Sequence, residues 1–423
     1  MENFRKLGLI EPILNSLQEQ NFKEPSEIQE KTIPLILEGK DIIAGAATGS
    51  GKTLAFASGI IKNSEKGKGI QAIVLTPTRE LAEQVAISLQ RFSKDKQLNI
   101  VPIYGGVSME YQLRKLTNAD VIVATPGRML DHLARRTIRL DNVKVLVLDE
   151  ADRMLDMGFQ RDVGKIISYC PVKRQTLLFS ATISEDISRL ASRYMNNPIR
   201  ISAQSYVDSS KLTQFYCSVR DQEKFSLLVH YLKNEKADLA MVFCNTQRKT
   251  EFISANLKKL GIDTLSIHGG YSQNQRSRAM SYFASGRIPV LICTDIAARG
   301  LDIKGISHIY NYDIPADKTD YVHRIGRTAR AGNEGKVINL IGSNDYENFG
   351  QILQNKSLKI EQIETPELGE IIITFGRSEY SGGNNRGRGG YSGRSGGRSD
   401  SRRSGGGYGG RSSGSSGRNF RRR

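Results

Sequence analysis

Two segments of the chain combine residue types that could bind and hydrolyse a nucleotide. Asp149-Glu150-Ala151-Asp152 follows an apolar run at 143–148, which predicts a buried parallel strand. Carboxylates after such a strand lie where open α/β sheets bind ligands. A second apolar run at 41–45 leads into Ala46-Ala47-Thr48-Gly49-Ser50-Gly51-Lys52-Thr53. Glycines at 49 and 51 let backbone N–H groups point at phosphate oxygens. Together the two segments predict a nucleotide hydrolase.

Each polar side chain of these segments has an expected task. Lys52 can reach the β- and γ-phosphates, and Thr53 can offer its hydroxyl to Mg²⁺. A helix expected from Leu54 to Lys62 adds the positive end of its dipole. Asp149 is the expected partner of the Mg²⁺ shell, and Glu150 can orient and deprotonate the attacking water. The alternative is a surface acid cluster that happens to follow a strand.

The charge balance favours a polyanionic partner. The chain of 423 residues has a net charge of +17 and is 38% hydrophobic. Twelve arginines, no lysine and two acids lie between Arg377 and Arg423, so this tail carries much of the excess. Such a balance suits nucleic acid. The simpler interpretation is charge that serves solubility.

Cysteine usage and hydropathy predict a cytoplasmic protein without membrane contact. Four cysteines, at positions 170, 217, 244 and 293, form no CxxC pair, which argues against a disulfide framework or a zinc site. No apolar run approaches the roughly 20 residues that span a bilayer. The residues from Met1 to Ile10 lack the layout of a signal peptide.

Short apolar strands alternate with amphipathic stretches in two similar halves, which predicts parallel sheets with helices on both faces. In the second half, strands are expected near 214–218, 240–244, 264–267, 290–293, 308–311 and 337–341. In the first half they are expected at 42–46, 71–76, 100–104, 121–124, 143–148, 176–180 and 199–202. A polar segment near Ala203–Lys211 marks the expected junction. From about Phe375 onward Gly, Ser and Arg dominate, which predicts disorder.

These motifs and their order resemble the DEAD-box family of RNA helicases, over about residues 1–365. The loop form Ala-x-x-Gly-x-Gly-Lys-Thr is the family's own form, which accounts for Ala46. The resemblance implies an α/β protein with two tandem RecA-like domains, at 1–204 and 205–365, followed by an RNA-binding tail at 366–423. It implies ATP and Mg²⁺ as cofactors and RNA-stimulated ATP hydrolysis that separates short duplexes with little sequence preference.

The resemblance assigns further residues to the nucleotide. Gln29 is expected to bond the adenine edge, and Phe4 and Phe22 to help form the adenine site. Asp302 is expected to meet the ribose. Asn21 stands where the family usually has Gly, a departure that affects only local turn geometry. Without the surrounding pattern, Gln29 would be an ordinary amide on a helix surface. The remaining expected ATP contacts are Ala47, Thr48, Gly49, Ser50 and Gly51 of the phosphate loop.

The same resemblance implies an RNA-binding set that follows strand ends in both halves. Arginines, helix N-termini and close backbone approach at glycine suit a sugar–phosphate chain. Taken alone, the segment at 125–127 is turn and cap chemistry. The expected RNA contacts are Pro77, Thr78, Arg79, Gly106, Thr125, Gly127, Arg128, Thr246, Arg276, Thr294 and Gly300.

A last group is expected to couple hydrolysis to unwinding. By resemblance Ser180, Thr182 and His323 are coupling residues between the domains, and Arg327 and Arg330 are arginine fingers on the γ-phosphate. The spacing of the two arginines places both on one face of a helix. Taken alone, the 180–182 segment would be a helix cap before Ser184, and the arginines a solvated basic face.

Three functions remain to be separated. The leading one is an ATP-dependent RNA helicase; the others are an RNA clamp with negligible turnover and a DNA translocase. Intact Lys52, Glu150 and both arginines argue against the clamp. The adenine motif and the 149–152 segment argue against the DNA motor. The expected partner is single-stranded and short duplex RNA, with ribosomal or RNA-decay complexes left open, and nothing demands more than a monomer.

Overall fold

The computed structural model describes residues 1–46, 49–202, 211–298, 303, 305–329, 334–355, 358–369 and 371. These residues form two sheets of seven strands each, ordered β3-β4-β2-β5-β6-β1-β7 and β10-β11-β9-β12-β13-β8-β14. Every strand pair in both sheets is parallel. The expectation of two α/β domains of the RecA-like type is therefore confirmed.

The strands of the first sheet coincide with the apolar runs of the first half. They are β1 (Ile42–Gly45), β2 (Ala72–Leu75), β3 (Ile100–Ile103), β4 (Val121–Ala124), β5 (Val145–Leu148), β6 (Gln175–Ser180) and β7 (Ile199–Ser202). Neighbouring residues of one strand enter different cores, since Ala44 and Val74 pack on one face while Ile43 and Ile73 pack on the other. A strand buried on both faces has to be apolar throughout, which is why the runs are continuous.

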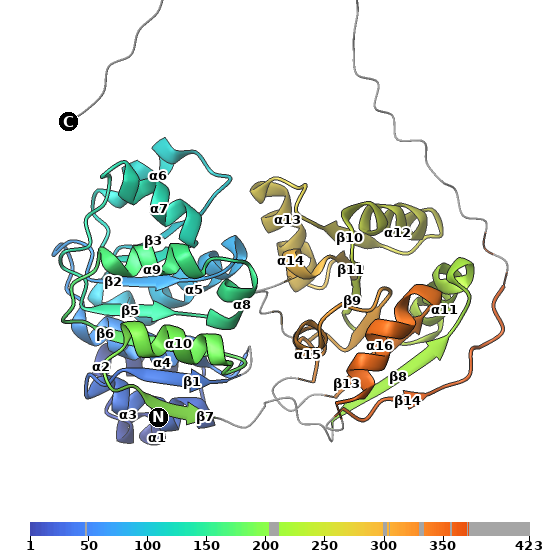
Figure 1. The fold of residues 1–423 in the computed structure, drawn as a ribbon, viewed down its shortest axis with the longest axis horizontal. Helices are drawn as coiled ribbons and strands as arrows, with labels where there is room; N and C mark the ends of the chain where they lie inside the picture. The colour runs from blue at the N-terminus through green and yellow to red at the C-terminus, as the bar shows by residue number, and fades with distance from the viewer. Residues whose placement is uncertain are drawn as a thin grey trace, which may run out of the picture. The chain divides into compact units, whose positions relative to one another are not determined.

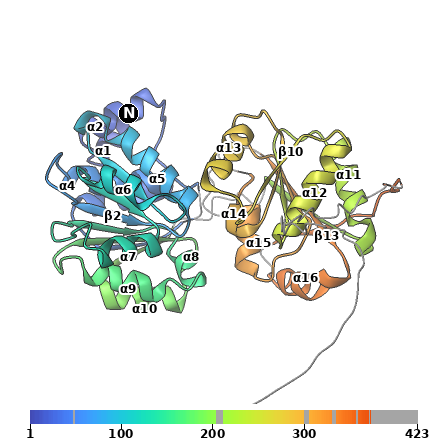
Figure 2. The same cartoon turned by 90° about the horizontal axis from the view of Figure 1, so that it is seen from above.

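Helices cover both faces of the first sheet (Figure 2). One face carries α1 (Glu2–Lys6), α2 (Glu11–Glu19), α3 (Glu27–Leu37), α4 (Lys52–Asn63) and α5 (Arg79–Phe92). The other carries α7 (Pro126–Ala134), α9 (Gln160–Ser168) and α10 (Glu185–Tyr194), with the short α8 (Ala151–Asp156). Between β3 and β4 runs α6 (Met109–Leu116). We call residues 1–202 the first lobe.

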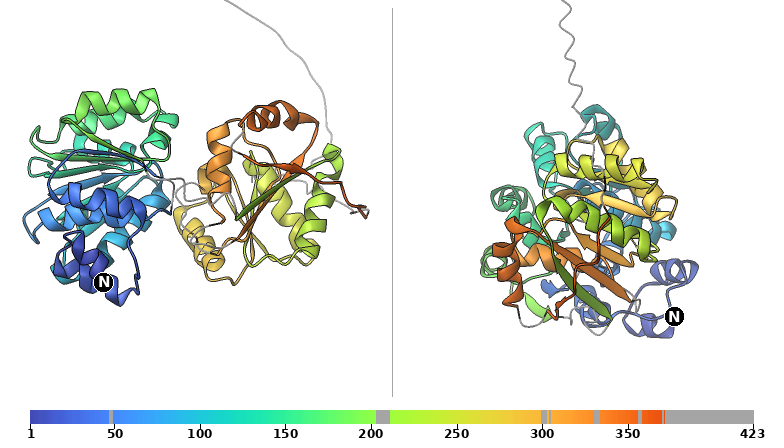
Figure 3. Two further views of the ribbon diagram at one scale, coloured as in Figure 1. Left: turned by 90° about the horizontal axis from the view of Figure 1, so that it is seen from below. Right: turned by 90° about the vertical axis from the view of Figure 1, so that its right-hand side faces the viewer.

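The second sheet repeats this plan (Figures 1 and 3). Its strands are β8 (Leu212–Ser218), β9 (Ala240–Phe243), β10 (Thr264–Ile267), β11 (Val290–Cys293), β12 (His308–Asn311), β13 (Gly335–Ile341) and β14 (Glu361–Gln362). One face is covered by α11 (Lys224–Asn234) and α12 (Gln247–Lys259). The other is covered by α13 (Gln273–Ala284), α14 (Asp295–Ala298), α15 (Lys318–Ile325) and α16 (Tyr346–Leu353). We call residues 211–371 the second lobe.

Several smaller expectations can be compared with this fold. All four cysteines are buried and free of disulfides. In the part of the chain that the structure describes, no helix is long and apolar enough to cross a membrane. The expected junction at Ala203–Lys211, apart from Lys211 itself, and the tail from 372 onward lie outside the described residues. The edge strand β14 was not predicted from the sequence.

Candidate active site

The phosphate loop connects β1 to α4, and two glycines give it its shape. Gly49 and Gly51 have φ angles of +83° and +92°, a left-handed conformation that glycine adopts without steric cost. The helix begins at Lys52, two residues earlier than predicted, so the N–H groups of its first turn face the loop. Lys52 is buried and donates from Nζ to the carbonyl oxygen of Ala46 at 3.3 Å. Ala47 and Thr48 lie outside the described residues.

Gln29 holds the end of this loop from α3. Its Nε2 donates to the carbonyl oxygen of Gly51 at 3.0 Å, while its Oε1 accepts the N–H of Ser26 at 3.0 Å. The hydroxyl of Ser26 donates to the carbonyl oxygen of Ser50 at 2.7 Å. Gln29 is 3% exposed, so it is not an ordinary amide on a helix surface. The amide couples the expected adenine site to the expected phosphate site.

The two aromatic residues of the expected adenine site differ in accessibility. Phe4 is fully buried in the first-lobe core, whereas Phe22 is only partly buried. Their rings pack edge to face with centroids 6.5 Å apart. Asn21, just before Phe22, has a φ of +57°, a left-handed conformation that asparagine tolerates better than most residues. The departure from the family's glycine thus preserves the turn.

The expected metal-binding acid lies at the end of β5. Asp149 is 3% exposed, its N–H donates to the carbonyl oxygen of Leu75 at 2.9 Å, and its Oδ1 accepts the N–H of Glu150 at 3.0 Å. Lys52 Nζ lies 3.9 Å from the same oxygen. Burial raises the pKa of Asp149 to about 6, against the opposing effect of the Lys52 ammonium. A carboxylate of this kind gains from a cation beside it.

Glu150 follows in a backbone conformation that few glutamates adopt. Its φ is +51°, and it occupies the N-cap position of α8. Left-handed backbone at a non-glycine residue costs of order 1 kcal/mol or more and is found preferentially at functional sites. The side chain is buried, next to Asp149 in the sequence.

Asp152 joins the acidic segment to the end of β6. Its Oδ2 accepts from the N–H groups of Ala181 and Thr182 at 3.0 and 2.9 Å, and from the hydroxyl of Thr182 at 3.1 Å. Ser180 donates its hydroxyl to the carbonyl oxygen of Thr182 at 2.7 Å. The N-cap of α10 is Ser184 instead, so Ser180 and Thr182 do not serve as that cap.

Seven of the predicted RNA-binding residues line one cavity of about 440 Å³. Thr78 and Thr125 are the N-caps of α5 and α7, so two helix N-termini face it. Other lining residues include Glu80, Met157, Phe159 and Ile296, which the sequence analysis did not assign. The predicted residues brought together here are Pro77, Thr78, Arg79, Thr125, Gly127, Arg128 and Arg276.

Neighbouring groups fix the arginines of this cavity. A Cβ added to Gly106 would stand 2.1 Å from Arg79 Nη1, so the guanidinium lies directly over the glycine. Arg128 Nη1 donates to the carbonyl oxygen of Val107 at 2.9 Å. Arg276 forms an ion pair with Glu80 at 3.0 Å, with both side chains buried. Burial lowers the pKa of Arg276, an effect that Glu80 opposes.

The other predicted second-lobe residues are placed differently. Thr246 is the N-cap of α12, and Thr294 follows β11; neither lines the cavity just described. Gly300 and Asp302 lie outside the described residues. His323 lies on α15 with its Nδ1 buried, and the described residues offer that nitrogen no hydrogen-bond partner.

The helical placement expected for Arg327 is wrong. Helix α15 ends at Ile325 with Gly326 as its C-cap, and Ala329 has a φ of +53°. Arg327 is therefore in the turn after the helix, where it is 5% exposed, and Arg330 lies outside the described residues. The spacing of three residues indicates a shared face only while a helix continues, and here the helix has ended.

Arg324 was missed as an organiser of the second lobe. It is 1% exposed, and its Nε and Nη2 donate to the two carboxylate oxygens of Asp295 at 2.6 and 2.7 Å. Nη1 donates to Asn311 Oδ1 at 3.1 Å and to the carbonyl oxygen of Asp313 at 2.5 Å. Nη2 also reaches Asn245 Oδ1 at 3.1 Å. One guanidinium thus ties together the segments that follow β9, β11 and β12.

The sequence matches known families over both lobes. Residues 26–190 match the DEAD/DEAH box helicase family, and residues 223–332 match the helicase conserved C-terminal domain. The chain is 43% identical over 376 residues to the ATP-dependent RNA helicase CshA of Listeria monocytogenes, covering 88% of this chain and 72% of the relative. The chain belongs to the DEAD-box helicase family.

Further comparisons agree with this placement. The helicase is 42% identical to the DEAD-box ATP-dependent RNA helicase CshA of Geobacillus kaustophilus, covering 88% of this chain and 80% of the relative. Its structure resembles that of S. cerevisiae Dbp5 bound to RNA and ADP BeF3, with a TM-score of 0.80 and 31% identity. The match covers 86% of this chain and 96% of the Dbp5 chain. It also resembles Mss116p bound to ssRNA and AMP-PNP, with a TM-score of 0.75, 27% identity, and coverage of 85% and 78%.

Proposed function

We propose that this DEAD-box ATP-dependent RNA helicase hydrolyses ATP in response to RNA and separates short duplexes locally, with little sequence preference. The first domain, residues 1–204, would hold the phosphates and the catalytic base. The second, residues 205–365, would supply Arg327 and Arg330 to the γ-phosphate. ATP and RNA would then each favour the joined arrangement of the domains, so each should strengthen binding of the other.

Within the nucleotide site, the roles follow from the contacts. Lys52 would neutralise the β- and γ-phosphates, and the first turn of α4 would donate its N–H groups to them. Glu150 would orient the attacking water and accept its proton. Asp302 would meet the ribose, and Gln29, which bonds Gly51, would relay the presence of adenine to the loop. Arginine fingers are worth about 10³–10⁵ in rate, so loss of Arg327 should lower turnover far more than RNA affinity.

The oxygen donors present fit Mg²⁺. Asp149 offers a buried carboxylate whose pKa is raised by that burial, and Thr53 offers a hydroxyl in the first turn of α4. Among the described residues no group of three or more His, Cys, Asp or Glu side chains could hold a metal, so the remaining ligands would be phosphate and water. When bound, the ion would neutralise charge that develops on the phosphates.

RNA recognition would rest on the sugar–phosphate chain. The cavity of Thr78, Arg79, Thr125 and Arg128 presents helix N-termini and guanidinium groups, which bind phosphates without reading bases. Contacts to 2′-hydroxyls would favour RNA over DNA. The tail at 366–423 would add affinity through arginine charge. Deletion of 377–423 should weaken RNA binding at low salt and leave basal ATP hydrolysis intact; equal affinity would remove the tail from the proposal.

Coupling between ATP and RNA would pass through Asp152. The observation that carries the proposal is that Lys52, Asp149 and Glu150 lie buried together while Asp152, two residues on, bonds Thr182. A pure clamp does not need the water-activating base, so an intact Glu150 favours turnover.

We further propose a cytoplasmic protein that acts as a monomer, with ribosomal or RNA-decay complexes as its setting.

The deciding measurement is steady-state ATP hydrolysis with single-stranded RNA, with matched DNA and without nucleic acid. We expect strong stimulation by RNA alone and its loss in the Glu150→Gln variant. Stimulation by DNA as well would favour a DNA motor. Tight ATP-dependent RNA binding without any turnover would favour the clamp instead.

A further inference from the structure

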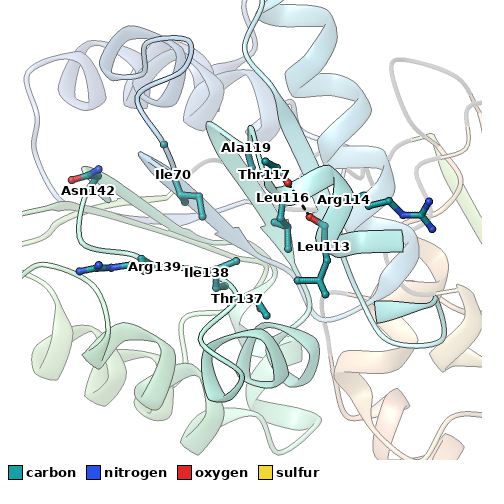
Figure 4. A pocket seen from close by; sticks show the side chains of 11 residues that line it. Ile70, Leu113, Arg114, Leu116, Thr117, Ala119, Thr137, Ile138, Arg139 and Asn142 are labelled. Carbon is teal, nitrogen blue, oxygen red and sulfur yellow. Dashed lines mark hydrogen bonds between the residues drawn. The ribbon is translucent and has the colours of Figure 1, made fainter. Parts of the chain in front are cut away.

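The first lobe has another cavity at the N-terminal ends of its strands, whereas the predicted nucleotide and RNA residues follow the C-terminal ends. This groove of about 610 Å³ is lined by residues 69–70, by the C-terminal half of α6 with residues 117 and 119, and by residues 137–139 and 142 (Figure 4). These segments precede β2, β4 and β5. All strands of the sheet are parallel. Segments that precede strands therefore lie at the N-terminal ends of the strands, and the catalytic motifs that follow strands lie at the C-terminal ends.

The lining of the groove is mixed, with apolar side chains such as Leu116 and Ile138, and Arg114 and Arg139 stand at its ends. Arg114 and Arg139 extend away from its floor on opposite sides, and Thr117, Thr137 and Asn142 add polar side chains (Figure 4). The cationic side chains near it are exposed. One nearby acid, Asp141, pairs with Arg139 at 2.8 Å, with side-chain exposures of 64% and 86%. Arg114 and Arg139 line the groove, and the exposed residues Lys68, Lys115 and Arg136 are the sequence neighbours of lining residues.

Helix α6 connects the C-terminal end of β3 to the N-terminal end of β4. It starts three residues after Gly106, the glycine beneath Arg79 of the RNA cavity, and its last turn contributes Arg114 to the groove. Eight helical residues span about 12 Å. On the same helix Tyr111 is 48% exposed, and Lys115 Nζ lies 4.6 Å from its ring centroid. Exposed aromatic and basic side chains along one path are the usual composition of a nucleic-acid surface.

We propose that this groove and the exposed face of α6 bind the phosphate backbone of structured RNA that extends beyond the strand held in the first cavity. The polyanion is favoured over a hydrophobic peptide because exposed cations stand at both ends of the groove, and Thr117, Thr137 and Asn142 add hydrogen-bonding groups to its partly apolar lining. Binding there would be independent of sequence and of ATP, because no residue of the groove belongs to the nucleotide site. The helicase would thereby retain a folded RNA while the cavity lined by Arg79 and Arg128 releases a strand.

The test compares two RNAs and two variants of the full-length chain. One RNA is a single strand of ten nucleotides; the other carries the same strand joined to a hairpin of twenty base pairs. The test variant is Arg114→Gln, Lys115→Gln and Arg139→Gln. The control removes equal charge from helix faces, by Lys31→Gln, Lys165→Gln and Arg189→Gln. All six side chains are exposed.

The test variant should bind the hairpin RNA about tenfold or more weakly at low salt, and its log–log salt slope should fall by about 2–3. Its affinity for the ten-nucleotide strand and its maximal RNA-stimulated ATP hydrolysis should match wild type. Asp141→Asn should act in the opposite direction and strengthen hairpin binding. The proposal is overturned if the hairpin affinity and slope of the test variant equal those of the control, or if Asp141→Asn weakens binding.

Discussion

Replacing Gly106 by alanine should displace Arg79 from the RNA cavity. An alanine Cβ at this position would stand 2.1 Å from Arg79 Nη1 and 2.8 Å from its Cζ. An ordinary contact needs about 3.4 Å, so the guanidinium has to move by more than about 1 Å. The end of a flexible side chain moves at little energetic cost, so the effect on folding from this clash should be small.

The backbone cost of this substitution can be measured separately. Gly106 has a φ of +83°, where alanine is disfavoured by about 1–2 kcal/mol. Gly39 has a φ of +82°, and a Cβ there would meet no atom within 4 Å. Gly39→Ala therefore reproduces the backbone strain without the clash. Both variants should lose similar thermal stability, and only Gly106→Ala should lose RNA affinity.

The expected loss of RNA affinity in Gly106→Ala is that of one hydrogen bond from the Arg79 guanidinium to RNA. A hydrogen bond from a charged donor is worth about 1.5–3 kcal/mol, which corresponds to roughly a 10- to 150-fold loss of affinity. The assay is fluorescence anisotropy with single-stranded RNA and a non-hydrolysable ATP analogue at several salt concentrations. One lost phosphate contact on a single strand should lower the salt slope by about 0.7. Nucleotide affinity without RNA should not change.

A double-mutant cycle decides whether the effect passes through Arg79. In an Arg79→Ala background, Gly106→Ala should have no further effect on RNA affinity, because the group that it displaces is absent. Two results would refute the reasoning: equal RNA affinities for Gly106→Ala and Gly39→Ala, or an undiminished effect of Gly106→Ala when Arg79 is gone.

Three further perturbations test the rest of the site. Since the pKa of Asp149 is raised to about 6, its ionised form is lost as pH falls through that value; the KM for Mg·ATP should rise below about pH 6, and this inflection should be missing in Asp149→Asn. Arg324→Ala leaves the Asp295 carboxylate without its bidentate partner, so the free energy of unfolding in urea should fall by about 3–5 kcal/mol, and adding Asp295→Ala should restore part of it. Thr182→Val removes one hydroxyl bond to Asp152, so RNA-stimulated hydrolysis should fall by about tenfold, while equal loss of ATP binding would contradict a coupling role.

Most of the fold could be predicted because its strands are buried on both faces. Continuous apolar runs such as Val145–Leu148 are shorter than a typical buried helix and are bounded by polar segments, and length and flanks together indicate strands. The strand β14 was missed for the opposite reason. Glu361–Gln362 is a two-residue edge strand with both side chains exposed, and its pairing with β8 is made by backbone groups that any sequence provides.

Residues of the site were predictable where their role follows from a local pattern. The loop at 46–53 and the carboxylates after β5 needed only the strand before them. Arg324 could not be assigned in this way, because its partners Asn245, Asp295 and Asn311 come from other segments of the second lobe. Glu80 was missed for the same reason, because its ion-pair partner Arg276 lies far from it in the sequence. Contacts between distant segments require the fold itself.

Many groups of the site are already fixed by their neighbours without any ligand. In the first lobe Gln29 bonds Gly51, and Asp152 bonds Thr182, in contacts that neither ATP nor RNA has to create. In the second lobe Arg324 fixes the segment after β11. Ligand binding therefore spends little free energy on ordering side chains, and more of it remains to favour one arrangement of the two domains. A helicase that acts as a switch requires this, because a ligand shifts a conformational equilibrium only by the difference between its affinities for the two states.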